Sequence, residues 1–212
     1  YDASEVARLF PEHVKDEHCL ILLVHEGPSS RVVAEIHAVE SIMADLGLNP
    51  ADAAAAEVWM DHRNNVPEWR DLLEQGLIAD TIEVSGTWGQ IHAIYDDVVA
   101  ALKTVPDCVN ASAHSSHVYR SGINLYFTFA CMPEDASVMG DSYLESWDRA
   151  LTATAEAGGG IAHHHGSGRL RRDYLHHDLG DNGIALLRKL KQAIDPQGIL
   201  NPGNLLPATD AD

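Results

Sequence analysis

The chain has 212 residues, of which 45% are hydrophobic, and a formal net charge of −18 with neutral histidines. The length fits one domain, or a large piece of a longer enzyme, and the apolar share is enough for a core. Such acidity excludes the basic stripe that nucleic-acid binding needs. No apolar run approaches the ~18 residues of a membrane helix. The mixed, acidic first ten residues do not resemble a signal peptide, so we expect a cytoplasmic protein.

Apolar patterns predict two strands and two helices in the first half of the chain. Residues 18–27, HCLILLVHEG, form a short apolar run that predicts a buried strand. Pro28 then opens a helix with apolar residues every three or four positions, ending at Gly47. Residues 78–85 alternate between apolar and polar side chains and predict a second strand. The next helix has one apolar face, made by Trp88, Ile91, Tyr95, Val98 and Leu102.

A β-hairpin and two more helices are predicted in the second half. Residues 109–119 and 123–131 are predicted strands, joined at Arg-Ser-Gly 120–122. Residues 141–157 and 181–194 are predicted helices, and Asp-Pro-Gln-Gly stops the second one. This order predicts an α+β fold, an antiparallel β-sheet with helices packed on one face.

The three cysteines form no CxxC pair and lie in apolar or strand-like segments. This pattern predicts free, buried thiols at Cys19, Cys108 and Cys131, in a reducing compartment.

The predicted strand 123–131 has one apolar and one polar face, because successive side chains of a strand point in opposite directions. The residues expected in the core are Leu125, Phe127 and Phe129. Tyr126 lies on the polar face, so its hydroxyl should reach a wet cleft or another polar group. The hairpin brings either His114 or His117 beside Tyr126, and the sequence leaves the register open.

Three consecutive histidines, His163, His164 and His165, lie between two glycine clusters. If this segment is extended, His163 and His165 face one way and His164 the other. A tyrosine alone is a poor base, with a reference pKa of about 10. A neighbouring histidine can lower that pKa or take the proton itself. Together with Tyr126 the triplet could transfer protons, or it could bind zinc or manganese.

Positive charge is concentrated in the last quarter of this acidic chain, close to the triplet. We interpret this distribution as a site for an anion. The cations are Arg169, Arg171, Arg172, Arg188, Lys189 and Lys191.

The segment GGGIAHHHGSGRLRRDYL, followed by LLRKLKQAIDPQGILNPGNLLP, resembles the C-terminal end of flavin-linked oxidases of the vanillyl-alcohol-oxidase superfamily. Within that superfamily it is most similar to the alkyldihydroxyacetonephosphate synthases. Three further stretches agree in order along the chain. They are YDASE at the start, EWRDLLEQGLIADTIEVSGTW and HSSHVYRSGINLYFTF.

The resemblance implies that residues 1–212 form the C-terminal cap, or substrate domain, a ferredoxin-like α+β unit over the flavin. FAD would be held mainly by an N-terminal FAD-binding domain absent from this chain, in which no GxGxxG follows a strand. The isolated cap is then expected to be inactive. The implied partners are that missing domain and an anionic small molecule, a phosphate or carboxylate, with a homodimer left open.

The resemblance also assigns roles to individual residues. Tyr126 matches the catalytic tyrosine of the family, and His163, His164 and His165 match its active-site triplet. The same comparison places His164, His165 and Gly166 against the flavin as cofactor-binding residues.

Two further positions carry over to substrate binding. Arg70 matches an arginine that meets the substrate's anionic group, for which a guanidinium is well suited. His117 stands where metal-dependent 2-hydroxyacid dehydrogenases of the superfamily keep a metal-ligand histidine. Those relatives have a second histidine in place of Tyr126, and a Glu-His pair in place of His164 and His165. We therefore expect no metal here and proton-transfer chemistry instead.

The implied function is alkyl-for-acyl exchange on acyl-dihydroxyacetone phosphate, with the flavin as covalent carrier or hydride acceptor. A FAD-dependent oxidase or dehydrogenase of a 2-hydroxy acid or alcohol is the first alternative. A non-catalytic, histidine-rich metal- or ligand-binding module is another, and a structural domain with a decayed site is the last. The module could use His114, His117, His163, His164, His165, His176 and His177.

Overall fold

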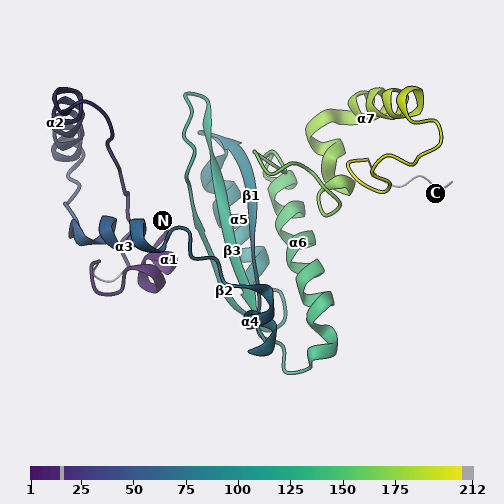
Figure 1. The fold of residues 1–212 in the computed structure, drawn as a ribbon, viewed down its shortest axis with the longest axis horizontal. Helices are drawn as coiled ribbons and strands as arrows, with labels where there is room; N and C mark the ends of the chain where they lie inside the picture. Colours follow the sequence, from purple (N-terminus) through teal and green to yellow (C-terminus); the bar gives the residue numbers. More distant parts are fainter. Residues whose placement is uncertain (15–16, 207–212) are drawn as a thin grey trace. The chain divides into compact units, whose positions relative to one another are not determined.

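The computed structural model describes residues 1–14 and 17–206, which divide into two compact units at Pro67 and Glu68 (Figure 1). Each unit has its own hydrophobic core. None of the helices in the described part of the chain is both long and apolar enough to cross a membrane.

The first unit is helical and has a small core. Its helices are α1 (Ala3–Leu9), α2 (Ser29–Leu46) and α3 (Ala54–His62). The core consists of Val6, Phe10, Leu20 and Ala55. Helix α2 confirms the helix predicted after Pro28, and it ends at Gly47 with a φ of +66°. None of the α2 side chains is buried.

The predicted strand at residues 18–27 is wrong. Only Leu20 of this run is buried, and it exchanges two backbone hydrogen bonds of 3.1 Å with Tyr1. A strand needs a partner along its length, and the described residues of this unit supply none. Cys19 is therefore exposed, which corrects the prediction of a buried thiol there. Cys131 is buried as predicted, and Cys108 is half-buried.

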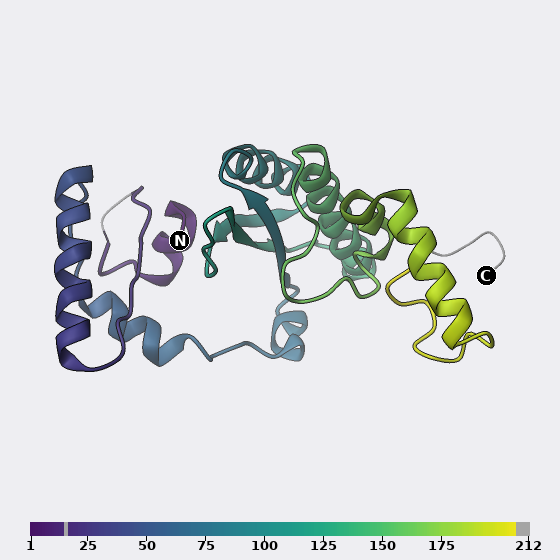
Figure 2. The same cartoon turned by 90° about the horizontal axis from the view of Figure 1, so that it is seen from above.

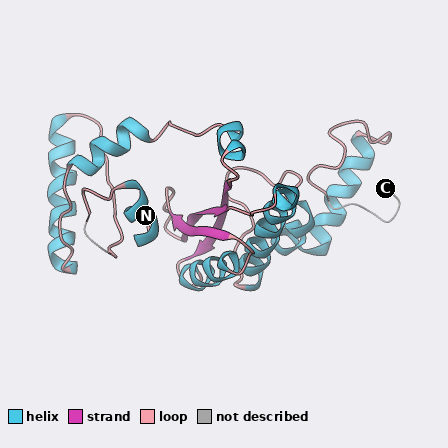
Figure 3. Cartoon of the chain, turned by 90° about the horizontal axis from the view of Figure 1, so that it is seen from below, coloured by secondary structure: helices cyan, strands magenta, loops and turns pink. Residues whose placement is uncertain are grey.

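The second unit is built on a three-stranded antiparallel sheet, which follows the short helix α4 (Trp69–Glu74). The strands, drawn in magenta in Figure 3, are β1 (Ile78–Thr87), β2 (Cys108–His114) and β3 (Gly122–Cys131). Their order in the sheet is β1-β3-β2. The hairpin of β2 and β3 and the strand at 78–85 are thus confirmed. Strand β2 stops at His114, several residues before the predicted end.

Helices cover one face of this sheet, which confirms the α+β prediction. Figure 2 shows α5 (Ile91–Lys103) and α6 (Met139–Glu156) on the same side of the strands. Leu125, Phe127 and Phe129 of β3 are buried there, as predicted. The remaining helical elements are the 3₁₀ turns η1 (Ala136–Val138) and η2 (Arg172–Tyr174), and α7 (Leu175–Ile194), interrupted at Gly180.

The loop after α6 pairs with the outer edge of β1 and then passes over the face opposite the helices. Gly160 exchanges two backbone hydrogen bonds with Ser85, of 2.8 and 3.0 Å. A Cβ at Gly160 would lie 2.6 Å from the Ser85 hydroxyl, so a larger residue here would require that hydroxyl to turn away. Ile82 and Val84 of β1 are buried in the core on the helix-covered face, whereas Glu83 between them is buried under this loop. This covered face carries the candidate site.

Candidate active site

Tyr126 lies in the central strand, directly between Glu83 of β1 and His114 of β2. The imidazole of His114 stacks on the phenol ring, with centroids 5.1 Å apart and planes 3° apart. The sequence left the register of this hairpin open, and the structure pairs His114 with Tyr126. The stacked imidazole covers one side of the phenol.

Two histidines of the triplet meet the Tyr126 hydroxyl. His164 Nε2 lies 2.9 Å and His165 Nε2 lies 2.8 Å from Tyr126 Oη. The loop is bent, so the expectation that His163 and His165 would share one direction is wrong. His163 turns instead toward the end of the β2–β3 hairpin, where its ring lies 5.3 Å from that of His117. The convergence of triplet and tyrosine is what the site prediction required.

His117 joins this cluster through a buried asparagine. Its ring centroid lies 4.6 Å from that of His164. Asn124 Oδ1 accepts the backbone N–H groups of His117 and Ser116 at 2.8 and 3.1 Å. Because Asn124 is fully buried, it fixes the turn that presents His117. Both candidate histidines of the hairpin thus reach the cluster, His114 by pairing and His117 by this turn.

Glu83 lies beneath the triplet and was missed by the sequence reasoning. Its side chain is fully buried, and its Oε1 accepts the backbone N–H of His164 at 2.6 Å. The Nδ1 atoms of His163, His164 and His165 lie 3.2 to 3.5 Å from its carboxylate oxygens. Strand alternation placed Glu83 on the polar face of β1, which suggested solvent. Only the loop that folds over this face buries it.

Arg171 ties the triplet loop to β1. Its Nε donates to the Ile161 carbonyl at 3.0 Å and its Nη1 to the Gly166 carbonyl at 3.3 Å. Its Nη2 donates to the Glu83 carbonyl at 3.2 Å and lies 3.7 Å from Glu83 Oε2. The guanidinium packs over the Trp147 ring, 4.8 Å from its centroid. One buried cation thus holds both ends of the loop and balances the buried carboxylate.

Burial sets the charge states of the central pair. It raises the pKa of Tyr126, and the negative charge of Glu83 raises it further. Burial lowers the pKa of His165, although the charge of Glu83 opposes this shift. At neutral pH the site therefore presents a neutral phenol hydrogen-bonded to a neutral imidazole. Such a pair can pass a proton in either direction.

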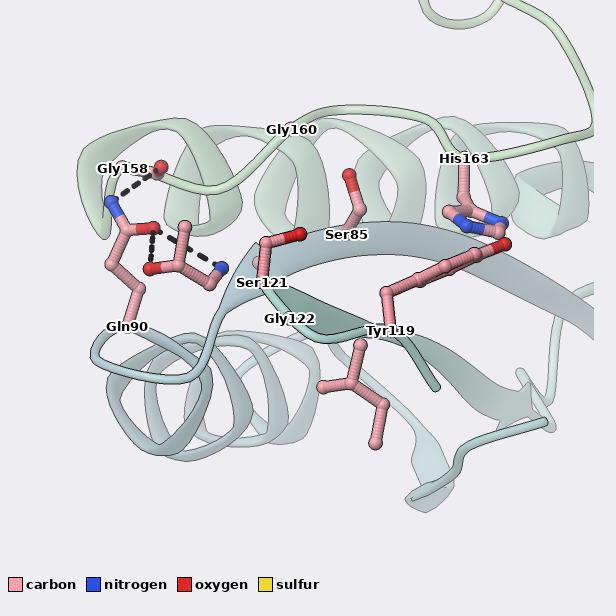
Figure 4. A pocket seen from close by; sticks show the side chains of 11 residues that line it. Ser85, Gln90, Tyr119, Ser121, Gly122, Gly158, Gly160 and His163 are labelled. Atoms are coloured by element: carbon pink, nitrogen blue, oxygen red, sulfur yellow. Dashed lines mark hydrogen bonds between the residues drawn. The ribbon is translucent and has the colours of Figure 1, made fainter. Parts of the chain in front are cut away.

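A cavity of about 290 Å³ lies beside the cluster. His163 and Tyr119 stand together at one end, and Gln90 closes the other end by donating to the Gly158 carbonyl (Figure 4). Ser85 and several glycines make up much of the wall, and no Asp, Glu, Lys or Arg lines the cavity. The space suits a small polar group held near the triplet.

Arg70 is not part of this cluster. It is an exposed residue of α4, and its neighbour Trp69 packs edge-on against Tyr143, with centroids 6.0 Å apart. Among the described residues, no hydrogen bond or ion pair joins Arg70 to Tyr126 or the triplet. Its contact with a substrate anion stays a prediction.

Two groups of side chains are close enough to share a metal ion, with donor atoms within 4.8 Å of one another. They are His117, His163 and His164, and Glu83, His164 and His165. Two further histidines named for a metal-binding module, His176 and His177, lie in α7 with ring centroids 4.0 Å apart and planes tilted by 39°.

The site fits a flavin ring better than a whole dinucleotide. The side chains of His164 and His165 are 37% and 41% exposed, so a planar ring could reach them from outside. Gly166, next in the chain, is exposed and has a φ of +77°. No strand in the described residues leads through a glycine-rich turn into a phosphate-binding helix. A bound flavin ring would therefore meet His164, His165 and Gly166.

Comparison with known proteins places the chain in a family. Residues 5–205 match the family described as FAD linked oxidases, C-terminal domain. The uncharacterized FAD-linked oxidoreductase YgcU of Escherichia coli O157:H7 is 31% identical over 98% of this chain and 45% of its own length. Alkyldihydroxyacetonephosphate synthase of Dictyostelium discoideum is 27% identical over 89% of this chain and 32% of its own length.

The fold is also found in solved structures. One of alkyldihydroxyacetonephosphate synthase superposes with a TM-score of 0.54 at 24% identity, covering 84% of this chain and 29% of that one. The chain thus spans less than half the length of these relatives. From the family match over nearly all of its length, and from the fold, the chain belongs to the FAD-linked oxidases, whose C-terminal domain it carries.

Proposed function

We propose that this chain is the substrate-binding and catalytic cap of a FAD-dependent enzyme similar to alkyldihydroxyacetonephosphate synthase. The observation that carries the proposal is the Tyr126 hydroxyl, within 2.9 Å of two imidazole nitrogens beside a polar cavity. Two alkyldihydroxyacetonephosphate synthases, 26% and 27% identical over about nine-tenths of the chain, support this choice.

The residues of this chain would bind the substrate and move a proton. A bound flavin would supply the redox or carrier chemistry, which no amino-acid side chain provides. The cavity beside His163 would hold the polar part of the substrate. Tyr126 would then take a proton from the reacting carbon as His165 takes the phenolic proton. Arg70 is the proposed contact for an anionic group.

Replacing Tyr126 by phenylalanine tests this proposal. In the complete flavoprotein, Tyr126→Phe should lower turnover of acyl-dihydroxyacetone phosphate with a fatty alcohol about 10²–10⁴-fold, the usual contribution of a general acid or base. The matched control is Tyr174→Phe, whose hydroxyl bonds Asp148 away from the cluster and which should keep full turnover. Unchanged turnover of Tyr126→Phe would remove this residue from the mechanism.

An oxidase or dehydrogenase acting on a 2-hydroxy acid is the second candidate. It is favoured by the match to D-2-hydroxyglutarate dehydrogenase of Danio rerio, 26% identical over 55% of this chain. The two reactions differ in electron balance, because alkyl exchange is redox-neutral overall. Anaerobic mixing with 2-hydroxy acids should leave the flavin oxidised if the exchange proposal is correct. Stoichiometric flavin bleaching would favour the dehydrogenase.

A metal-binding module is the third candidate, favoured by the two groups of clustered donors. Calorimetric titration with zinc separates it from a proton-transfer site. Tight, stoichiometric binding that survives Tyr126→Phe would support the module. The proposed function expects no such binding, because the Nε2 atoms of His164 and His165 are engaged with Tyr126.

A further inference from the structure

The tyrosine at the centre of the cluster poses a question of proton placement. Tyr126 Oη is within hydrogen-bond distance of the Nε2 atoms of both His164 and His165. A phenol has a single proton to donate. One imidazole must therefore accept that proton, while the other donates its own Nε2–H to the same oxygen. Tyr126 by itself does not decide between them.

The contact of His165 on the side away from Tyr126 indicates which of its nitrogens carries the proton. Its Nδ1 lies 3.5 Å from Glu83 Oε2, an oxygen that is buried and makes no hydrogen bond. An ionised carboxylate only accepts hydrogen bonds. A proton on His165 Nδ1 gives this oxygen a donor, whereas a bare Nδ1 would set a lone pair against negative charge. Because a neutral imidazole has one N–H, the Nε2 of His165 is then free to accept.

The partners of His164 complete a consistent network. Its backbone N–H occupies Glu83 Oε1, and its Nδ1 lies 2.9 Å from the Nδ1 of His163. If His163 donates across that contact, His164 carries its own proton on Nε2 and donates to Tyr126. His164 Nδ1 also lies 3.2 Å from Glu83 Oε1, but that oxygen already accepts the His164 backbone N–H at 2.6 Å, whereas Oε2, beside His165, has no donor among the described residues.

We propose that Glu83 is a positioning residue that holds the proton of His165 on Nδ1 and so makes His165 Nε2 the acceptor for the Tyr126 proton. This rests on the proposed function, since it gives that proton transfer a direction. In the step, the Tyr126 O–H bond breaks and the His165 Nε2–H bond forms. The phenolate takes the substrate proton, and the imidazolium points its second N–H at Glu83.

The surroundings of Glu83 keep its carboxylate in place for this role. The charged and titratable groups that face it are Arg171, Tyr126 and the three histidines of the triplet. Arg171 Nη2 also bonds the Glu83 carbonyl, so backbone and side chain are held from the same direction. The carboxylate is thus held by Arg171 and by the His164 backbone N–H.

The substitution Glu83→Gln tests the assignment. The His164 N–H requires an acceptor at the Oε1 position, so the new amide places its oxygen there and its NH₂ at the Oε2 position. That NH₂ is a donor aimed at His165 Nδ1, and it should drive the His165 proton to Nε2. Side-chain ¹⁵N NMR of the chain distinguishes the two tautomers, with the His165 signal identified by its loss in His165→Asn.

Asp80→Asn is the matched control. Asp80 lies on the same strand and also carries one negative charge, but its Oδ2 accepts from Tyr143 on the helix-covered face. This variant removes a nearby charge without altering the contact with the triplet, so the His165 tautomer should not change. If Asp80→Asn shifted the His165 tautomer as much as Glu83→Gln does, the proposal would be overturned.

The outcomes separate this inference from the proposed function. A wild-type spectrum with the His165 proton on Nε2 overturns it, whether or not Glu83→Gln folds. A folded Glu83→Gln that keeps the Nδ1–H form also overturns it. In Tyr126→Phe the Nδ1–H form of His165 should persist. A switch to Nε2–H would show that Tyr126, and not Glu83, determines the His165 tautomer. Unchanged turnover of Tyr126→Phe, by contrast, contradicts the proposed function and leaves the tautomer assignment standing.

Discussion

Tyr126 and His165 have pKa values shifted in opposite directions by the same cause. Burial disfavours the charged form of each group, which is the phenolate of the tyrosine and the imidazolium of the histidine. Glu83 amplifies the shift of the tyrosine and opposes that of the histidine. Glu83 therefore raises both pKa values: it adds to the effect of burial on Tyr126 and offsets it on His165. Both groups stay neutral at neutral pH.

The shifted pKa of His165 predicts a pH dependence of stability. Its pKa in the folded state is depressed, so the unfolded state binds the proton more tightly. The stabilising contribution is present above the unfolded pKa of about 6.5 and is lost as the pH falls through the folded pKa. Between pH 8 and pH 5.5, urea unfolding should show a smaller decrease in the free energy of unfolding for His165→Asn than for the wild type. Equal losses would contradict the assignment.

Asn124 should matter for stability through the turn that it holds. Asn124→Ala leaves the backbone N–H groups of Ser116 and His117 without their acceptor. The free energy of unfolding should fall by about 1–3 kcal/mol, the cost of unsatisfied groups. Denaturant unfolding measures this, with the exposed Asn182→Ala as a control expected to change it by about 0.5 kcal/mol or less. A loss no larger than that of the control would mean that water replaces the amide.

At the scale of elements, the paired ends of β1 and β3 beside the cavity leave no room for a side chain at Gly122. A Cβ on Gly122, the first residue of β3, would lie 2.1 Å from the Gly86 carbonyl oxygen of β1. That neighbour is backbone, so it cannot swing aside as a flexible side chain would. The glycine therefore sets the spacing of the strands that form this wall of the cavity.

Gly122→Ala should be strongly destabilising for this reason. The clash forces the strand ends apart, and we expect a loss of about 1–3 kcal/mol in the free energy of unfolding, as for other overpacked sites. Gly89→Ala is the control, because a Cβ there meets nothing within 4 Å. Thermal unfolding of both variants provides the comparison. Equal melting temperatures would show that the strands can separate at no cost.

The elements that the sequence predicted correctly have a periodic apolar pattern and a local partner. The helices α5 and α6 and the hairpin of β2 and β3 meet both conditions. The apolar run at 18–27 failed because a strand depends on a neighbour that its own sequence cannot supply. Whether 161–165 is extended could not be predicted for a related reason, since Glu83 and Arg171 bend that loop from outside it.

At the scale of the molecule, the two cores draw on separate parts of the chain. The core of the first unit uses residues before Pro67, and that of the second uses residues from Ile78 onward. Every residue of the Tyr126 cluster belongs to the second unit. The candidate site therefore has all of its described supporting contacts within one unit.

A chain of residues 68–206 should consequently fold and keep the cluster. Its core contains more than twenty buried side chains, including Phe127 and Phe129, and none of them comes from the first unit. Circular dichroism and side-chain ¹⁵N NMR would test this, the full chain being the reference. Loss of cooperative unfolding, or of the His165 signal seen in the full chain, would show that the first unit is required.

The sequence by itself determined the α+β class, the main helices and the hairpin, and it singled out the tyrosine and the histidine triplet as candidate site residues. These follow from short-range periodicity and from residue types that retain their chemistry in any setting. Only the tertiary structure decided which imidazoles meet Tyr126, how both His114 and His117 reach it, and that Glu83 is buried under the triplet. Those outcomes depend on a loop folding over a strand about eighty residues away in the chain, and a long-range contact of this kind leaves no pattern in the local sequence.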